Sequence, residues 1–173
     1  IKFYCNDTAG NMNETSTRYF TMNVSVKKCA SAGVANALDS QGQNETNNIK
    51  ASENTRADIT GIDKNTPQWL KVNMTGVIPA GSVIDNATAT VEHYEQVTGI
   101  TPALQWNNGT GWATQCTFAN AVADTNDTCA LSSSIDTVGE ANAIDLRMYY
   151  TSSSAAAKDA YVDYMTVLVC YQE

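Results

Sequence analysis

Charged side chains are scarce in this sequence. They make up 16% of its 173 residues, whereas about 25% is usual for a soluble domain. The 18 acidic residues outnumber the 10 basic ones, and the formal net charge is -8. The basic residues form no cluster that could replace the counterions of phosphate groups. We therefore expect neither nucleic acid nor an anionic membrane as a partner.

Long apolar runs are missing as well. No stretch approaches the ~20 apolar residues that cross a bilayer, and the last residues carry no lipidation signal or anchor tail. The chain opens without the charged and apolar regions of a signal peptide, so we expect a mature secreted chain that has lost that peptide. We predict a single domain over residues 1–173, located outside the cell or at its surface, without a membrane span.

Residue patterns typical of catalysis are weak. His93 is the only histidine, and no Gly-x-Ser-x-Gly motif accompanies it. Its place at the end of an alternating strand favours a hydrogen-bonded structural role. A glycoside hydrolase needs two carboxyl groups roughly 5 to 10 Å apart, and Glu140, Asp145, Asp159 and Asp163 have the spacing of ordinary solvated faces. We expect the chain not to be an enzyme, with a secreted hydrolase as the third alternative for its function.

Metal-ligand patterns are weak too. The cysteine spacings match no zinc motif. The segment 124–127 is similar to the start of a calcium loop, but it lacks the glycine at the sixth position and the terminal glutamate. We predict no metal site and no cofactor, while calcium in another acidic loop stays open.

The sequence is rich in the N-glycosylation signal Asn-X-Ser/Thr. Composition predicts roughly three such signals by chance, but eight are present and seven of them carry Thr. In Leu70–Thr75 the apolar residues alternate with Asn73 on the polar face, so a glycan there would stand off the sheet. Passive generation by an Asn- and Thr-rich composition is the competing explanation. The predicted sites are Asn6, Asn13, Asn23, Asn44, Asn73, Asn86, Asn108 and Asn126.

The five cysteines are expected to form structural disulfides in an oxidising compartment. Cys116 and Cys129 are close in sequence and flank a polar loop, so we predict that they pair. Cys5 with Cys29 is the next choice. Cys170 is then left over, either buried in the last strand or cross-linked to a second chain.

Apolar residues alternate along several segments, which predicts mostly β-structure. The final segment, Tyr161–Tyr171, is apolar on both faces, which indicates a central strand or one covered by another molecule. Residues 31–58 are expected to form a long polar loop, with a short helical turn at Val34–Leu38. The fold prediction is all-β, a single β-sandwich of jelly-roll or immunoglobulin-like type. The other predicted strands are Phe20–Val26, Leu70–Thr75, Val83–Tyr94, Leu104–Trp106, Trp112–Phe118 and Ala143–Thr151.

Aromatic side chains offer one candidate binding site. Trp69, Trp106, Trp112, Tyr149 and Tyr150 are candidates for a platform that stacks against sugar rings. Trp106 and Trp112 flank a turn, where carbohydrate-binding sandwiches often display such rings. Packing in the core, or cover of a sheet edge, is the alternative explanation for these aromatics.

Two motifs carry a resemblance. The first is Trp69-Leu70-Lys71-Val72-Asn73 followed by Ile78-Pro79-Ala80-Gly81-Ser82-Val83-Ile84, and the second is Ala160-Tyr161-Val162-Asp163-Tyr164-Met165. Both resemble secreted β-sandwich modules of archaeal and phage-like surface proteins, in which the first motif precedes a strand and the second closes the domain. With its glycosylation signals, the chain is also similar to subunits of archaeal extracellular filaments of the thread and bundling-pilus type. That resemblance implies donation of an N-terminal strand to a neighbouring subunit. The donor would lie in Ile1–Tyr4 or Tyr19–Val26, within an N-terminal strand region that spans residues 1–28.

The leading hypothesis is a structural subunit of a glycosylated extracellular filament or cell-surface coat, assembled from copies of itself by strand complementation. No glycosylation signal follows Asn126, which suggests that the C-terminal strands stay clear for protein contact. The alternative is a carbohydrate-binding or adhesive module that uses Trp106 and Trp112. Covalent N-glycans are expected in either case.

Overall fold

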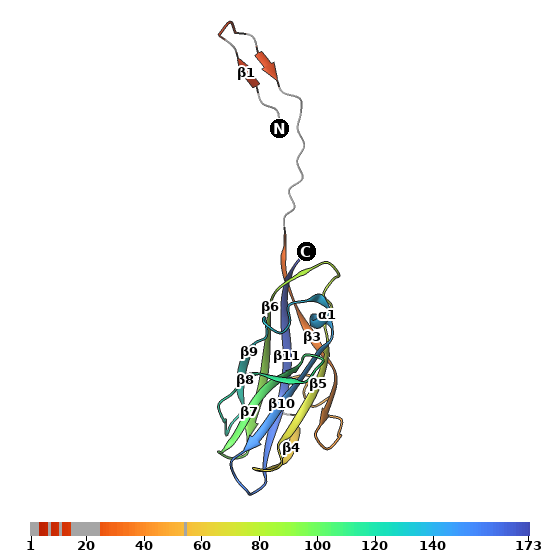
Figure 1. The fold of residues 1–173 in the computed structure, drawn as a ribbon, viewed down its shortest axis with the longest axis vertical. Helices are drawn as coiled ribbons and strands as arrows, with labels where there is room; N and C mark the ends of the chain where they lie inside the picture. Colours follow the sequence, from red (N-terminus) through yellow and green to blue (C-terminus); the bar gives the residue numbers. More distant parts are fainter. Residues whose placement is uncertain (1–3, 7, 11, 15–24, 54) are drawn as a thin grey trace.

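The computed structural model describes residues 4–6, 8–10, 12–14, 25–53 and 55–173, and it is almost entirely β-structure (Figure 1). Two short strands, β1 (Tyr4–Asn6) and β2 (Met12–Glu14), pair with each other. All other described strands belong to one nine-stranded antiparallel sheet that is folded over on itself. These strands are β3 (Lys27–Asp39), β4 (Ala57–Ile62), β5 (Gln68–Thr75), β6 (Val83–Glu95), β7 (Ile100–Asn107), β8 (Trp112–Thr117), β9 (Thr125–Ala130), β10 (Ile144–Ser152) and β11 (Lys158–Gln172).

The folded sheet forms the two layers of a β-sandwich, as the sequence predicted. The first layer has the order β3-β11-β6-β9, with β4 beside the first part of β11. The second layer has the order β3-β5-β10-β7-β8. Strand β3 belongs to both layers, because residues 27–32 pair with β11 and residues 33–39 pair with β5.

Alternating side chains fill the space between the layers. On β5 the inward residues Leu70, Val72 and Met74 are buried, and their neighbours on the strand are not. A side-chain period of two is what a strand with one wet face requires. Strands β6 and β10 show the same alternation, and the core is built from these inward positions.

Strand β11 is central, which is one of the two explanations its sequence offered. It pairs with β6 along one side and with β3 and β4 along the other. That the C-terminal strands stay clear for protein contact remains a prediction, but β11 and β10 each lie between two neighbouring strands, so neither has a free edge. Their apolar residues serve the core and the sheet, which explains the sequence pattern without a second molecule.

The disulfides confirm one prediction and correct another. Cys116 of β8 is bonded to Cys129 of β9, as predicted, and this bond joins the free edges of the two layers. Cys29 is bonded to Cys170, not to Cys5, so Cys170 is not left over. The reason is the antiparallel pairing of β3 with β11, which places Cys29 directly opposite Cys170, with their Cα atoms 4.0 Å apart. The Cys5 side chain lies outside the described part of the chain.

The prediction of a long polar loop over residues 31–58 was wrong in part. The first third of the supposed loop, residues 31–39, belongs to the long strand β3, and the expected helical turn at Val34–Leu38 is extended. The misleading feature is residue size, because two of the buried residues of β3 are the small Ala32 and Ala37. Only the segment between β3 and β4 is a loop.

A single helix occurs among the described residues, α1 (Val138–Asn142). Its N-terminus has a capping box, in which Thr137 and Glu140 each accept a hydrogen bond from the backbone of the other. This arrangement satisfies two otherwise unpaired backbone donors. Within the described residues, no helix is both long enough and apolar enough to cross a membrane.

Candidate functional site

Three aromatic side chains lie on the outer face of the second layer. Trp69 of β5 and Tyr149 of β10 are directly opposite each other across the strand pair. Trp112 of β8 is opposite Asn107 of β7. All three rings are half-buried. We call this surface the aromatic face, and its residues are Trp69, Lys71, Asn73, Gln105, Asn107, Trp112, Asp145, Arg147 and Tyr149.

The guanidinium group of Arg147 contacts two of these rings. Its Cζ atom is 4.4 Å from the ring centre of Trp112 and 4.8 Å from that of Tyr149. Arg147 Nε donates a hydrogen bond to Gln105 Oε1 at 2.7 Å. Burial lowers the pKa of Arg147, and the nearby Tyr149 only partly offsets this effect. Stacking on two rings holds the guanidinium in a defined place.

A second group of contacts surrounds Asp145. Its two carboxylate oxygens accept hydrogen bonds from Asn73 Nδ2 at 3.0 Å and from Asn107 Nδ2 at 2.9 Å. Lys71 Nζ lies 3.4 Å from Asp145 Oδ2 and 5.8 Å from the ring centre of Trp112. Residues from β5, β7, β8 and β10 are thus held in one connected network.

Trp106 and Tyr150 are not part of this face, which corrects the predicted pairing of Trp106 with Trp112. Trp106 is opposite Ala113, whereas Trp112 is opposite Asn107, so the two tryptophans project from opposite faces of the sheet. Trp106 packs against the core. Tyr150 is fully buried, and burial raises the pKa of its hydroxyl well above the usual value.

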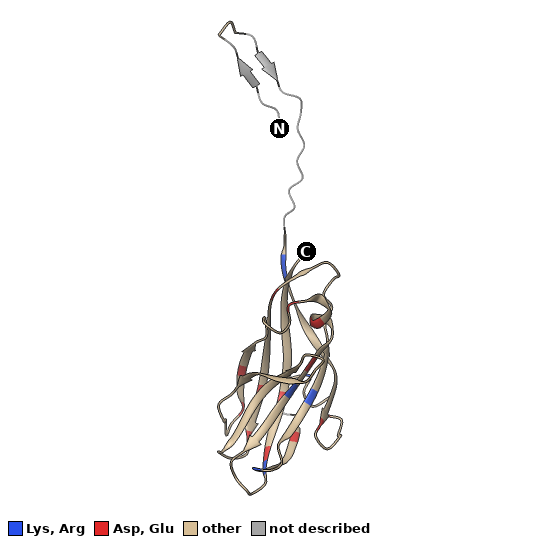
Figure 2. Cartoon of the chain, viewed as in Figure 1, with Lys and Arg blue, Asp and Glu red and all other residues tan. Residues whose placement is uncertain are grey.

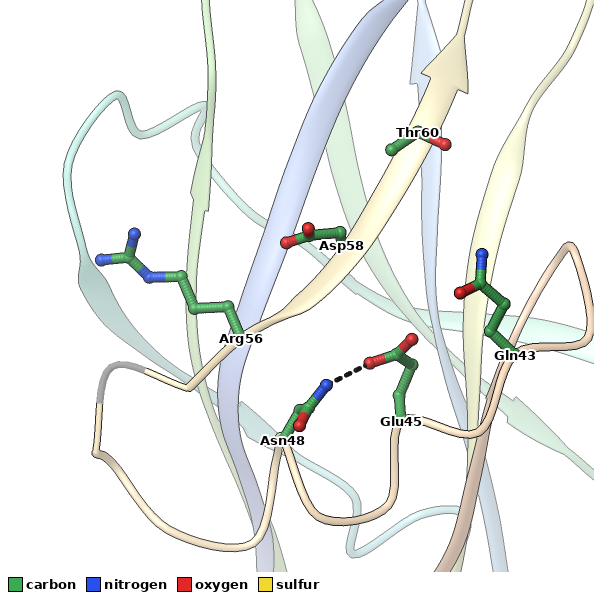
Figure 3. Close-up of a pocket in the computed structure, with 6 residues that line it drawn as sticks. All are labelled: Gln43, Glu45, Asn48, Arg56, Asp58 and Thr60. Carbon is green, nitrogen blue, oxygen red and sulfur yellow. Dashed lines mark hydrogen bonds between the residues drawn. The ribbon is translucent and has the colours of Figure 1, made fainter.

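A polar pocket of about 220 Å³ lies beside β4, on the side of the first layer (Figure 3). Glu45 is buried there and accepts a hydrogen bond from Asn48. Arg56 points away from Glu45 and Gln43 in Figure 3. Its guanidinium is bound to the Tyr94 hydroxyl and to Asp124. The lining contains no aromatic ring, and its residues are Gln43, Glu45, Asn48, Arg56, Asp58 and Thr60.

His93 is a buried, hydrogen-bonded histidine, as predicted. It is 0% exposed, with Nδ1 2.9 Å from Glu95 Oε1 and Nε2 3.2 Å from Asp127 Oδ2. Its ring stacks on Phe118. Burial lowers the pKa of His93, but the hydrogen bonds and charges of Glu95 and Asp127 outweigh this effect and raise it overall. The ring fastens β9 to β6 inside the sandwich and does not face a ligand site.

The carboxylates considered for hydrolysis have separate structural contacts. Glu140 caps α1, Asp145 belongs to the aromatic face, and Asp159 accepts a hydrogen bond from the Gly61 backbone. Asp163 is buried in β11. Asp124 and Asp127, from the segment similar to a calcium loop, contact Arg56 and His93 instead. The described residues contain no cluster of three or more metal-ligating side chains.

The predicted glycosylation sites differ in how exposed their asparagine side chains are. The described side chains of Asn44, Asn86, Asn108 and Asn126 are exposed. Asn73 is half-buried at the centre of the aromatic face, where its amide nitrogen is bound to Asp145. Asn6, Asn13 and Asn23 have side chains outside the described part of the chain. The outward position predicted for Asn73 is correct, but its amide is engaged.

Comparison with known proteins gives only distant likenesses. No family model and no curated protein matches the chain. A solved structure described as a xylan-binding module CBM15 has a TM-score of 0.44 and 8% sequence identity, over 83% of this chain and 97% of that one. A family two carbohydrate esterase from Cellvibrio japonicus has a TM-score of 0.30 and 11% identity, over 86% of this chain and 35% of that one. At these TM-scores neither likeness carries an argument about function.

Proposed function

We propose that this protein binds carbohydrate on the aromatic face. The observation that carries the proposal is the placement of Trp69, Trp112 and Tyr149 on one outer face among amide, carboxylate and cationic side chains. A sugar ring has apolar C–H faces and a rim of hydroxyl groups. Aromatic rings match the first, and side chains with both donors and acceptors match the second.

The dimensions suit a chain of sugars. Trp69 is on β5 and Trp112 is on β8, three strand spacings away in the order β5-β10-β7-β8. At about 4.8 Å per spacing the face extends for roughly 14 Å across the strands. A short oligosaccharide can contact several strands at once. The network around Asp145 holds these side chains in place before a ligand arrives, which reduces the entropy lost on binding.

The setting of the proposed function is extracellular. Two disulfides among the described residues are typical of proteins from oxidising compartments. The exposed glycosylation signals support the same location.

A binding experiment with matched aromatic variants tests the proposal. Affinity electrophoresis of the folded chain in gels that contain soluble plant, fungal or microbial polysaccharides would find the ligand. We expect Trp112→Ala to weaken binding at least about tenfold, because a tryptophan in a binding site is a typical hot spot. Tyr94→Ala is the control, since Tyr94 stacks on Tyr161 at 4.3 Å on the other layer. Absence of binding to every polysaccharide, or an equal loss in both variants, would contradict the proposal.

Assembly into a filament is the second candidate. The observation in its favour is a set of exposed valines, Val26, Val77 and Val83, with exposed fractions of 51%, 74% and 65%. Val26 and Val83 lie at the same end, because Lys27 and Val83 are both opposite Gln172. Most of the candidate donor segments, residues 1–3 and 19–24, lies outside the described residues.

Electron microscopy decides this second candidate. Negative-stain images of the concentrated chain should show filaments that Val77→Asp and Val83→Asp together disperse. Monodisperse particles at high concentration would exclude it.

A further inference from the structure

The aromatic face differs in charge from the rest of the molecule. The chain as a whole has 18 acidic and 10 basic residues, and acidic residues are spread over the body of the domain in Figure 2. On the aromatic face the charged residues are Lys71, Arg147 and Asp145, so two cations accompany one anion. The face is locally positive on a protein of net charge -8.

The two cations are not equivalent. Lys71 is 3.4 Å from Asp145, which is also bound by two asparagine amides, so this carboxylate is already satisfied. Arg147 makes its one side-chain hydrogen bond within the described structure through Nε, to the neutral Gln105. Arg56, by comparison, is paired with Asp124 at 2.8 Å. Arg147 is therefore a partly buried cation whose Nη groups have no carboxylate partner among the described residues.

The position of Arg147 indicates which group of a ligand could pair with its Nη donors. A guanidinium group binds a carboxylate through two parallel N–H donors, and this pairing strengthens when water is partly excluded. The ring centres of Trp112 and Tyr149 are 4.4 and 4.8 Å from the guanidinium carbon of Arg147. A sugar ring stacked on either aromatic ring would bring a carboxyl group attached to that sugar close to Arg147.

We propose that the aromatic face is selective for acidic polysaccharides, with the carboxylate of a uronic acid bound by Arg147. The inference rests on the proposed carbohydrate binding and adds its substrate class. Long-range attraction cannot produce this selectivity, because the net charge of -8 repels a polyanion. Selectivity must come from short-range contact, which survives at an ionic strength of about 0.1 M, where charges more than about 10 Å apart are screened.

The test compares two forms of one polymer, polygalacturonate with charged carboxylates and its fully esterified form, in which each carboxyl group is a neutral methyl ester. In titrations at that ionic strength, we expect polygalacturonate to bind at least tenfold more tightly than the ester. Arg147→Gln should remove this preference, because binding of polygalacturonate falls further than binding of the ester. Arg56→Gln is the matched control, because Arg56 also stacks on an aromatic ring, at 4.5 Å from Tyr94, on the other layer.

Each result has a distinct meaning. Equal affinity for the two polymers, or a preference that survives Arg147→Gln, would overturn the inference while carbohydrate binding itself stands. Tighter binding of a sulfated galactan than of polygalacturonate would overturn the assignment to uronic acids. Failure of the unmodified chain to bind any polysaccharide would instead refute the proposed function.

Discussion

The buried group of His93, Glu95 and Asp127 makes folding stability depend on pH in a way that can be measured. His93 and Glu95 are both 0% exposed, and Glu95 also accepts a hydrogen bond from the Ala121 backbone at 2.6 Å. The replacement His93→Leu fills this space with an apolar side chain and leaves the carboxylates of Glu95 and Asp127 without their cationic partner. Removal of one member of a buried ion pair costs about 3–5 kcal/mol. We expect a loss of that size in the free energy of unfolding near pH 6.

The sign of the pH dependence follows from the raised pKa of His93. The groups that face the ring are Glu95 from its own strand and Asp127 from β9, with the uncharged Phe118 stacked on it. The folded protein holds the proton more tightly than the unfolded chain does. The imidazolium therefore contributes its full stabilisation below the unfolded pKa of about 6.5 and loses it as pH rises through the folded pKa.

Urea unfolding from pH 5.5 to pH 9, followed by tryptophan fluorescence with the disulfides intact, measures this effect. The difference in unfolding free energy between the unmodified chain and His93→Leu should be largest at the acid end and shrink as pH rises. Adding Glu95→Leu to His93→Leu should recover part of the loss, because an unpaired buried charge is then removed. A difference that stays constant with pH, or no recovery in the double variant, would refute the reasoning.

Three other outcomes are expected. Removing the Cys29–Cys170 disulfide with Cys29→Ala and Cys170→Ala should lower the free energy of unfolding by about 5 kcal/mol, against about 3 kcal/mol for removal of the Cys116–Cys129 disulfide. The chain-entropy estimate gives this order because the sequence separations are 141 and 13. Equal midpoints of the two variants in guanidinium titrations would contradict it. Thr75→Ala removes the glycosylation signal of Asn73 but not its hydrogen bond, and the intact mass should fall by no more than the substitution itself. Loss of a glycan there would show that the aromatic face is covered. Trp106→Ala should lower the free energy of unfolding by about 3 kcal/mol and leave the affinity for polysaccharide unchanged. A loss of affinity without a loss of stability would show that Trp106 belongs to the binding site.

Local patterns predicted the strands that have large inward residues. In β6 and β10 apolar and polar side chains alternate, and both strands were expected close to their observed bounds. Strand β3 was missed because the buried Ala32 and Ala37 carry little hydrophobic signal. Strand β4 begins at the end of the same polar stretch, and most of β9 is polar and precedes Cys129.

The candidate site was only partly visible in the sequence. Trp69, Trp112 and Tyr149 were among the aromatics considered, but Arg147 was not singled out. Its significance depends on β10 lying between β5 and β7, an order that no local pattern specifies. The one available signal is the position of Arg147 two residues before Tyr149, on the polar face of an alternating strand.

The sequence by itself determined the class of this protein, a disulfide-linked β-sandwich with few charges and many glycosylation signals. Composition and a side-chain period of two are sufficient for that, because each acts over a few residues. Tertiary structure alone decided that Cys29 meets Cys170, that Trp106 and Trp112 face opposite ways, and that Arg147 contacts two aromatic rings. These features depend on which strands pair and in which register, and pairing is a long-range property set by the packing of the whole core.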